Sequence, residues 1–148
     1  MLDDLDKNII EILNNDGRAN NKDIAAALSV SEGTIRNRIN KLRETGLLTI
    51  SGLISPDDVD SRQLVFLGIN VAKSKNLLKK SKQISKLENV LSVSITSGRY
   101  DMIVEVWVDV KYGLIDFLSK QLAEVTEIAA TESFLVMKSC NKYIAVNN

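Results

Sequence analysis

The sequence contains no histidine, and this absence removes most of the common catalytic and metal-binding arrangements. A serine or cysteine nucleophile has no imidazole base, and the single cysteine, Cys140, cannot assemble the usual zinc ligands alone. Carboxylate pairs or a carboxylate-bound magnesium ion remain open, but no spacing of the acids favours either. We therefore expect a protein that is not an enzyme and that needs no metal or cofactor.

Cysteine and long apolar runs are equally scarce. One cysteine excludes an internal disulfide framework, and we expect Cys140 to be a small apolar filler near the end of a strand. The longest apolar run, around residues 64–69, is far too short to cross a bilayer. The acidic N-terminus shows no secretory signal, so the sequence predicts a cytoplasmic location.

The formal net charge is zero, but the charges are unevenly distributed. Residues 31–43 contain four basic side chains and one acid, whereas residues 100–134 contain seven acids and two lysines. Because counterion release depends on the contacting surface, a local basic element can bind nucleic acid on a neutral protein. The low total charge predicts modest affinity for a single copy, so strong binding would need pairing or higher assembly.

The N-terminal part carries the pattern of three short helices. Apolar side chains recur at helical spacing in residues 5–13, 24–28 and 35–42. Asn20 and Ser31 are suitable N-cap residues for the second and third segments, and a glycine follows the third. Three such helices with a tight turn before the third form a helix-turn-helix unit.

The third predicted helix has two chemically different faces. Ile35, Ile39 and Leu42 lie on one side, so the amide and basic side chains turn to the other. An asparagine amide can pair with an adenine edge, and basic side chains can hold phosphates or guanine. A solvated amphipathic helix is the alternative. We expect DNA contacts from Ser31, Gly33, Thr34, Arg36, Asn37, Arg38 and Lys41.

The helices are followed by a short alternating segment and a break. Residues 47–54 predict a strand or wing, and Pro56, the only proline, stands among acids directly afterwards. We predict three parts in the chain, which are a helix-turn-helix domain, a linker and a second domain, at residues 1–54, 55–62 and 63–148.

The second domain follows the order strand, helix, strand, strand, helix, strand. The predicted strands cover residues 64–71, 90–96, 102–108 and 128–137, and the predicted helices cover residues 76–87 and 112–125. This βαββαβ order is typical of the ferredoxin-like α+β fold. Such a sheet has one face covered by helices and one bare face, so we expect the bare face to pack on a partner sheet. On the sheet, Trp107 and Phe134 are expected to pack rather than to bind a ligand.

The turn at residues 97–101, Ser-Gly-Arg-Tyr-Asp, has the chemistry to bind an amino acid. A glycine frees backbone N–H groups for close approach, Asp101 can accept an ammonium and Arg99 can pair with a carboxylate. An ordinary hairpin turn, in which Asp101 accepts hydrogen bonds from local backbone donors, is the alternative.

Residues 73–86 contain six lysines and no acid. The simplest interpretation is the exposed face of a helix. A second surface that contacts nucleic acid is the alternative.

The whole chain resembles the Lrp/AsnC family, also called feast/famine regulators. The resemblance lies in residues 5–10, 16–18 and 31–39, and in Ser97-Gly98-Arg99-Tyr100-Asp101, which matches the family's Ser-Gly-x-aromatic-Asp turn. One motif falls in each domain, in the right order and separation. The chain departs from the family at Ser29, where a glycine is frequent, and serine tolerates a left-handed conformation less well. From the lysine and asparagine content we expect an archaeal source.

The resemblance implies a sequence-specific transcriptional regulator that senses a small amino acid. Glutamine or another polar amino acid would suit the side chains of Arg99 and Asp101. It also implies homodimers that form through the C-terminal sheets and assemble into tetramers or octamers. Effectors would bind between dimers near Gly98, Arg99, Tyr100 and Asp101, with Thr131, Glu132 and Ser133 from the neighbouring dimer. A non-specific DNA-organising protein is one alternative. A sirohaem decarboxylase, which shares the two-domain plan, is another, although those enzymes are expected to use histidines.

Overall fold

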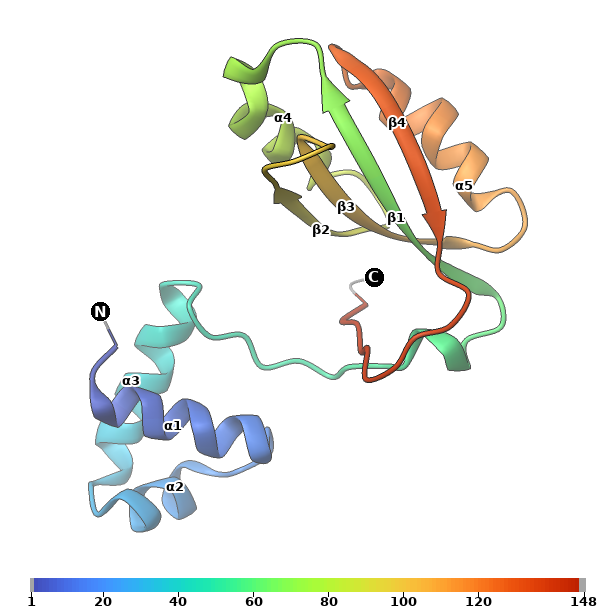
Figure 1. Ribbon diagram of the computed structural model, residues 1–148. Helices are drawn as coiled ribbons and strands as arrows, with labels where there is room; N and C mark the ends of the chain where they lie inside the picture. Colours follow the sequence, from blue (N-terminus) through green and yellow to red (C-terminus); the bar gives the residue numbers. More distant parts are fainter. Residues whose placement is uncertain (1, 147–148) are drawn as a thin grey trace. The chain divides into compact units, whose positions relative to one another are not determined.

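The computed structural model describes residues 2–146, and the chain divides into two compact units between Gly52 and Leu53 (Figure 1). The first unit is helical and the second combines one sheet with short helices. This confirms the predicted fold class. The predicted linker, residues 55–62, belongs to the second unit, where Pro56–Asp58 forms a single 3₁₀ turn. The limits of the functional domains stay a prediction.

The first unit consists of α1 (Asp4–Asn15), α2 (Asn21–Leu28) and α3 (Glu32–Glu44). Each helix begins at a polar N-cap whose side chain accepts a backbone N–H three residues later; these caps are Asp3, Asn20 and Ser31. The caps satisfy donors that the first turn would otherwise leave without a partner. Each helix contributes apolar residues to one shared core, in which Ile9, Ile24 and Ile35 are almost fully buried.

Ser29 follows α2 in the left-handed conformation, at φ 55° and ψ 42°. Its N–H and that of Val30 donate to carbonyls at the end of α2, which turns the chain toward α3. The resemblance to the Lrp/AsnC family singled out this position, because the family frequently has a glycine where this chain has Ser29. A Cβ atom makes this conformation costly, so the turn between α2 and α3 is strained at one residue.

The predicted wing is wrong. Residues 47–53 form no strand, and Ile54 makes only an isolated bridge with Ile144. Leu47 and Ile50 are about half exposed. An alternating segment becomes a strand only when a partner offers a hydrogen-bonded ladder, and this segment has none in residues 2–146.

The second unit contains a four-stranded antiparallel sheet in the order β2-β3-β1-β4. The strands are β1 (Arg62–Val71), β2 (Val90–Ile95), β3 (Met102–Asp109) and β4 (Ile128–Leu135), and the helices are α4 (Leu77–Ile84) and α5 (Gly113–Asp116). The second predicted helix is less regular than expected, because α5 continues as a π-helical turn at Phe117–Gln121 and a 3₁₀ turn at Leu122–Glu124.

One face of this sheet carries the core. Alternate residues of β1 and β3, among them Leu67, Ile69 and Val104, are fully buried. They pack against Ile84 of α4 and against Phe117, which directly follows α5 in the sequence. Figure 1 shows both helices on this side of the sheet. Because successive side chains of a strand point to opposite faces, each β1 residue lies either on this core face or on the other face of the sheet.

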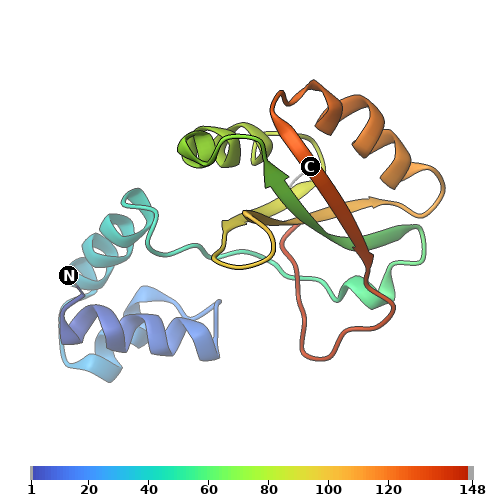
Figure 2. The same ribbon diagram turned by 45° about the horizontal axis from the view of Figure 1, so that its top comes forward.

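The other face is not bare, in contrast to the prediction. The last segment, red in Figure 2, turns back from β4, and Ile144 packs with Leu64 and Trp107 in a second small core. Lys142 lies 2.7 Å from Glu105 on β3. Trp107 packs on the sheet as predicted.

Cys140 lies in this returning segment and is exposed, so the prediction of a buried apolar filler is wrong. A second contact ties the segment to the start of the unit, since the Ser139 N–H donates to Asp57 at 2.9 Å. That hydrogen bond, together with Lys138, lowers the pKa of Asp57. No helix within residues 2–146 is long and apolar enough to cross a membrane.

Candidate nucleic-acid interface and ligand site

The outer face of α3 has the arrangement that the sequence predicted. Ile35 and Ile39 are buried in the core shared with the other two helices, and Leu42 is also buried. The opposite side presents exposed side chains and one glycine. A Cβ atom added to this glycine would meet only the Ser31 hydroxyl, at 3.9 Å. These exposed residues are Gly33, Arg36, Asn37, Asn40 and Lys41. A small residue near the helix start lets the backbone approach a partner closely.

Two polar pairs fix the first turns of α3. The Ser31 hydroxyl accepts the Thr34 N–H at 3.1 Å and hydrogen-bonds the Thr34 hydroxyl at 2.8 Å. One turn on, Arg36 lies 2.7 Å from Glu32 at the surface. Both pairs are solvent-exposed, so they orient the side chains and can exchange partners at little cost.

Arg38 differs from the other predicted DNA contacts. Its guanidinium lies 2.5 Å from Asp3 and 3.2 Å from Asp6 at the start of α1. The side chain is 35% exposed and Asp6 only 12%. The hydrogen bond with Asp3 and its charge raise the pKa of Arg38. The pKa of Asp3 is lowered, chiefly by the hydrogen bond from the Asp6 N–H and then by the hydrogen bond from Arg38. Arg38 thus joins α3 to α1 and is engaged within the protein.

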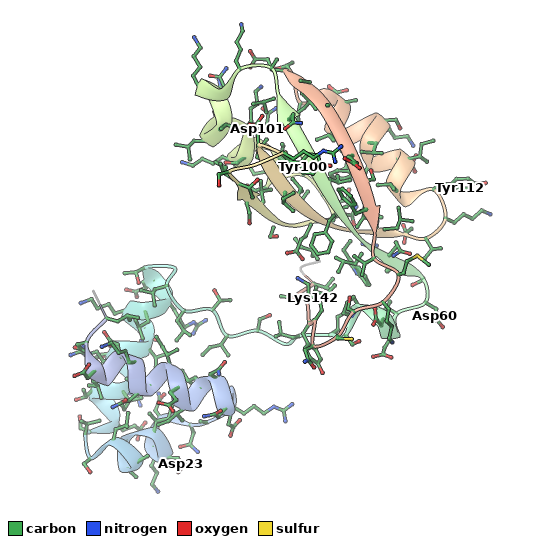
Figure 3. All side chains as sticks on the ribbon, in the orientation of Figure 1. Asp23, Asp60, Tyr100, Asp101, Tyr112 and Lys142 are labelled. Carbon is green, nitrogen blue, oxygen red and sulfur yellow. The ribbon has the colours of Figure 1, made fainter. Side chains whose placement is uncertain are left out.

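The second candidate site lies on the turn between β2 and β3. Thr96 closes the turn, since its N–H donates to the Asp101 carbonyl and its hydroxyl to the Tyr100 carbonyl. Gly98 adopts φ 147°, which favours glycine. Tyr100 and Asp101, labelled in Figure 3, end the turn. The turn folds back over the sheet, so its side chains meet strands that are distant in sequence.

Tyr100 lies directly over Gly68 in the middle of β1. A Cβ atom on Gly68 would stand 2.7 Å from the tyrosine ring, which is closer than any real contact. The ring also meets Phe134 of β4 edge to face, with centroids 6.1 Å apart. Gly68 was not among the predicted site residues, although a glycine inside a strand is a recognised sign that another group approaches closely.

Arg99, Tyr100 and Glu132 form one polar cluster on this face. The Tyr100 hydroxyl donates to the Glu132 carboxylate, and Arg99 lies 3.5 Å from the same carboxylate. The Arg99 guanidinium also lies 5.5 Å from the centre of the tyrosine ring. The hydrogen bond to Glu132 raises the pKa of Tyr100. Both charged side chains remain largely solvent-accessible, so a polar ligand can compete for them.

Asp101 has a structural task within the turn. Its carboxylate accepts the Val71 N–H at 2.9 Å, and its own N–H donates to the Asn70 side chain at 3.0 Å. These bonds hold the turn on the end of β1. Asp101 thus satisfies a backbone donor, but that donor lies 30 residues away on β1 and not within the turn, and a ligand ammonium would have to share the carboxylate.

The predicted β4 residues do not converge on one site. Glu132 pairs with Gly68 and shares its face, whereas Thr131 and Ser133 pair with Ile69 and Leu67 on the helix-covered face. Directly opposite residues in an antiparallel pair point to the same side. Thr131 lines a shallow hollow beside Leu122 and Ile128 instead. Of the three predicted β4 residues, Glu132 is the one that contacts Arg99 and Tyr100 of the turn within one protomer.

Both units are similar to known proteins. Residues 2–43 match the AsnC-type helix-turn-helix domain, and residues 64–145 match the Lrp/AsnC ligand binding domain. The chain is 31% identical to the HTH-type transcriptional regulator FL11 of Pyrococcus horikoshii over 93% of this chain and 91% of that protein. It is 27% identical to the regulatory protein AsnC of Haemophilus influenzae over 93% of each chain.

Solved structures show the same fold. The Escherichia coli AsnC structure is 25% identical, covers 94% of each chain and superposes with a TM-score of 0.71. A transcriptional regulator from Neisseria meningitidis in complex with L-Met is 20% identical, covers 99% of this chain and 97% of its own, and superposes with a TM-score of 0.74. At this identity the second similarity concerns the fold alone.

Proposed function

The chain belongs to the Lrp/AsnC family of transcriptional regulators, and from this membership we propose a separate function for each of its two units. The first unit docks the exposed face of α3 in the major groove of DNA. The second unit binds an amino acid at the turn between β2 and β3, in the cytoplasm, and thereby changes assembly or DNA binding. The family and the relatives are regulators rather than enzymes, which excludes the decarboxylase alternative.

The exposed polar face of α3 is the observation that carries the proposal. Asn37 stands exposed at its centre, and its side-chain amide suits a bidentate contact to adenine. Arg36 and Lys41 flank it and suit phosphates or guanine, while Gly33 permits close approach. We assign the same surface role to Ser31 and Thr34. Arg38 is assigned a different role, that of holding α3 against α1.

Selection of bound sequences from random DNA tests this assignment. We expect a preferred site with two related half-sites about 34–36 Å apart, or a multiple of that spacing, if two copies bind as a symmetric pair. The variant Asn37→Ala should weaken binding to the selected site by about 1–3 kcal/mol and relax the preference at one position. Asn14→Ala, an exposed asparagine on α1, is the matched control and should bind normally.

A selection that returns no preferred sequence would overturn specific recognition. Steep salt dependence together with that result would favour the non-specific DNA-organising alternative.

We propose that two copies pair through the sheet. β4 is an edge strand; Phe134 and Leu135 at its end are 44% and 52% exposed, and Met137 just after it is 90% exposed. Exposed apolar side chains on an unpaired edge favour association with another chain. Light scattering after size-exclusion chromatography should give a dimer or a multiple of it. A monomer at all concentrations would contradict the pairing.

An amino-acid effector is supported by the ligand-binding domain match and by the charges at the turn. Arg99 can hold a carboxylate, and Asp101 or Glu132 can accept an ammonium. The Neisseria relative was solved with L-Met, which supports the same ligand class. Effector binding alters regulation only through unequal affinity for two states of the protein.

Calorimetric titration with each of the twenty amino acids tests the effector. Asp101→Asn keeps an oxygen that can accept the Val71 N–H but removes the charge, so it should reduce binding while the unit stays folded. Asp60→Asn, an exposed acid of the same unit, should bind like the wild type. Absence of heat for every amino acid would remove the sensor from the proposal and leave DNA binding untouched.

A further inference from the structure

Residues 73–86 contain six lysines without an acid, and the structure separates these lysines into two groups. Lys80 is buried, at 5% exposure, and its ammonium lies 3.0 Å from the Thr126 hydroxyl and 3.5 Å from Glu127. Lys73 lies 3.9 Å from Glu127. The remaining four, which we call the lysine stripe, are exposed; they are Lys75, Lys79, Lys82 and Lys86.

The stripe follows one side of the α4 segment. Lys79 and Lys82 lie within α4, three residues apart, on the side opposite the buried Ile84. Lys75 stands in the turn before α4 and Lys86 in the turn after it, at spacings of four residues. At about 1.5 Å per residue, the four charges extend over roughly 16 Å.

Within residues 2–146, no carboxylate lies within 4.0 Å of any stripe lysine. The other lysines of this unit have partners. Lys120, Lys138 and Lys142 lie 2.8, 3.3 and 2.7 Å from acids, and Lys111 lies 5.4 Å from the centre of the Tyr112 ring. The unpaired ammonium groups are therefore concentrated along α4.

Helix stability does not explain this concentration. The first turn of α4 has no acid, although the N-terminus of a helix favours negative charge. Like charges three and four residues apart also repel each other. Outside residues 73–86, the unit carries eleven acids and six lysines or arginines. The stripe is thus a local positive surface on an otherwise acidic unit.

We propose that the lysine stripe binds the phosphate backbone of duplex DNA. The occupant is argued from charge complementarity, since the family binds DNA and a duplex carries a negative charge about every 1.7 Å along its axis. The contact is independent of base sequence and is additional to that of α3. It gives the second unit a direct part in holding DNA.

The test measures the salt dependence of binding by the full-length protein to a 60-base-pair duplex of random sequence, between about 50 and 200 mM salt. Each phosphate contact contributes about 0.9 to the slope of log K against log salt. The variant K79Q/K82Q should therefore lower the slope by up to about 1.8 per protomer. Its melting temperature should not fall, because both side chains are exposed and have no carboxylate partner.

K111Q/K120Q is the matched control, because it removes two exposed positive charges from the same unit outside the stripe. It should leave the slope unchanged. An equal fall in both variants would overturn the proposal, because it would indicate a general charge effect. An unchanged slope in K79Q/K82Q would also overturn it and would point to another acidic partner. Specific recognition by α3 is tested separately, by the preference of each variant for the selected sequence.

Discussion

The Arg38 guanidinium on α3 lies 2.5 Å from the Asp3 carboxylate that caps α1, across 35 residues of sequence. The same guanidinium lies 3.2 Å from the largely buried Asp6. By residue type and helix position, Arg38 is a reasonable DNA contact. By its partners, it positions α3 on the rest of the first unit. The two roles predict different mutant behaviour.

Replacing Arg38 with glutamine should lower the melting temperature of the first unit by several degrees, because Asp6 loses the partner for its charge. DNA binding should weaken with an unchanged salt slope. Circular dichroism and fluorescence anisotropy measure the two effects. Arg36→Gln, exposed on the same helix, is the control and should leave stability unchanged. A slope lower by about 0.9 with normal stability for Arg38→Gln would assign Arg38 to a phosphate instead.

The pH dependence of the first unit should reflect Asp3. Its pKa lies below the ordinary value of 3.8, chiefly through the Asp6 N–H and then through Arg38. A lowered carboxyl pKa stabilises the folded state above the ordinary value, and this contribution disappears as the pH falls through the folded value. Asp3→Asn should therefore be less stable than wild type at neutral pH, with a difference that shrinks below about pH 4.

Urea unfolding followed by helical circular dichroism measures this difference. Trp107, the only tryptophan, lies in the second unit, so its fluorescence is an internal control that should not respond to Asp3→Asn. A difference that stays constant down to pH 2 would show that the Asp3 charge is unimportant.

Ser29→Gly should stabilise the first unit by up to about 1 kcal/mol, because glycine removes the cost of the left-handed conformation at φ 55°. Ala26→Gly, an exposed position inside α2, should destabilise it by a similar amount through lost helix propensity. Urea unfolding of both variants distinguishes relief of strain from a general effect of glycine. Lower stability for Ser29→Gly would be inconsistent with a strained turn.

Gly68→Ala should displace Tyr100 from the sheet, because the added Cβ has no room beneath the ring. We expect a lower melting temperature and loss of amino-acid binding in calorimetry. The double variant Gly68→Ala/Tyr100→Ala should recover stability but not ligand binding. Gly52→Ala, which meets open space, is the control. Normal ligand binding by Gly68→Ala would separate the ligand site from this contact.

Tyr100 should ionise above pH 10, because the hydrogen bond to Glu132 raises its pKa. Glu132→Gln should move that transition back toward pH 10 in an absorbance titration. The raised pKa also predicts that the stability from this contact is present below pH 10 and is lost as Tyr100 ionises. An identical titration curve for the wild type and Glu132→Gln would contradict the hydrogen bond.

Local patterns predicted the regular elements well. N-caps at Asn20 and Ser31, the buried side of α3 and the strand order βαββαβ all depend on neighbours within a few residues, and the structure has them. The unusual turn at Ser29 was indicated only by the resemblance to the family, in which a glycine is frequent at this position. The wing failed because residues 47–54 alternate without a partner strand, and alternation alone does not supply one.

By itself, the sequence determined the two units and the exposed face of α3, because periodicity and caps act between residues close in the chain. The motifs at residues 31–39 and 97–101 carried the resemblance to the family. The tertiary structure alone decided that Arg38 is held by Asp3 and that Tyr100 lies over Gly68. It also placed Glu132 on the opposite face of the sheet from Thr131 and Ser133. Such contacts join residues some 30 positions apart, and they follow from packing and strand register, which no local pattern specifies.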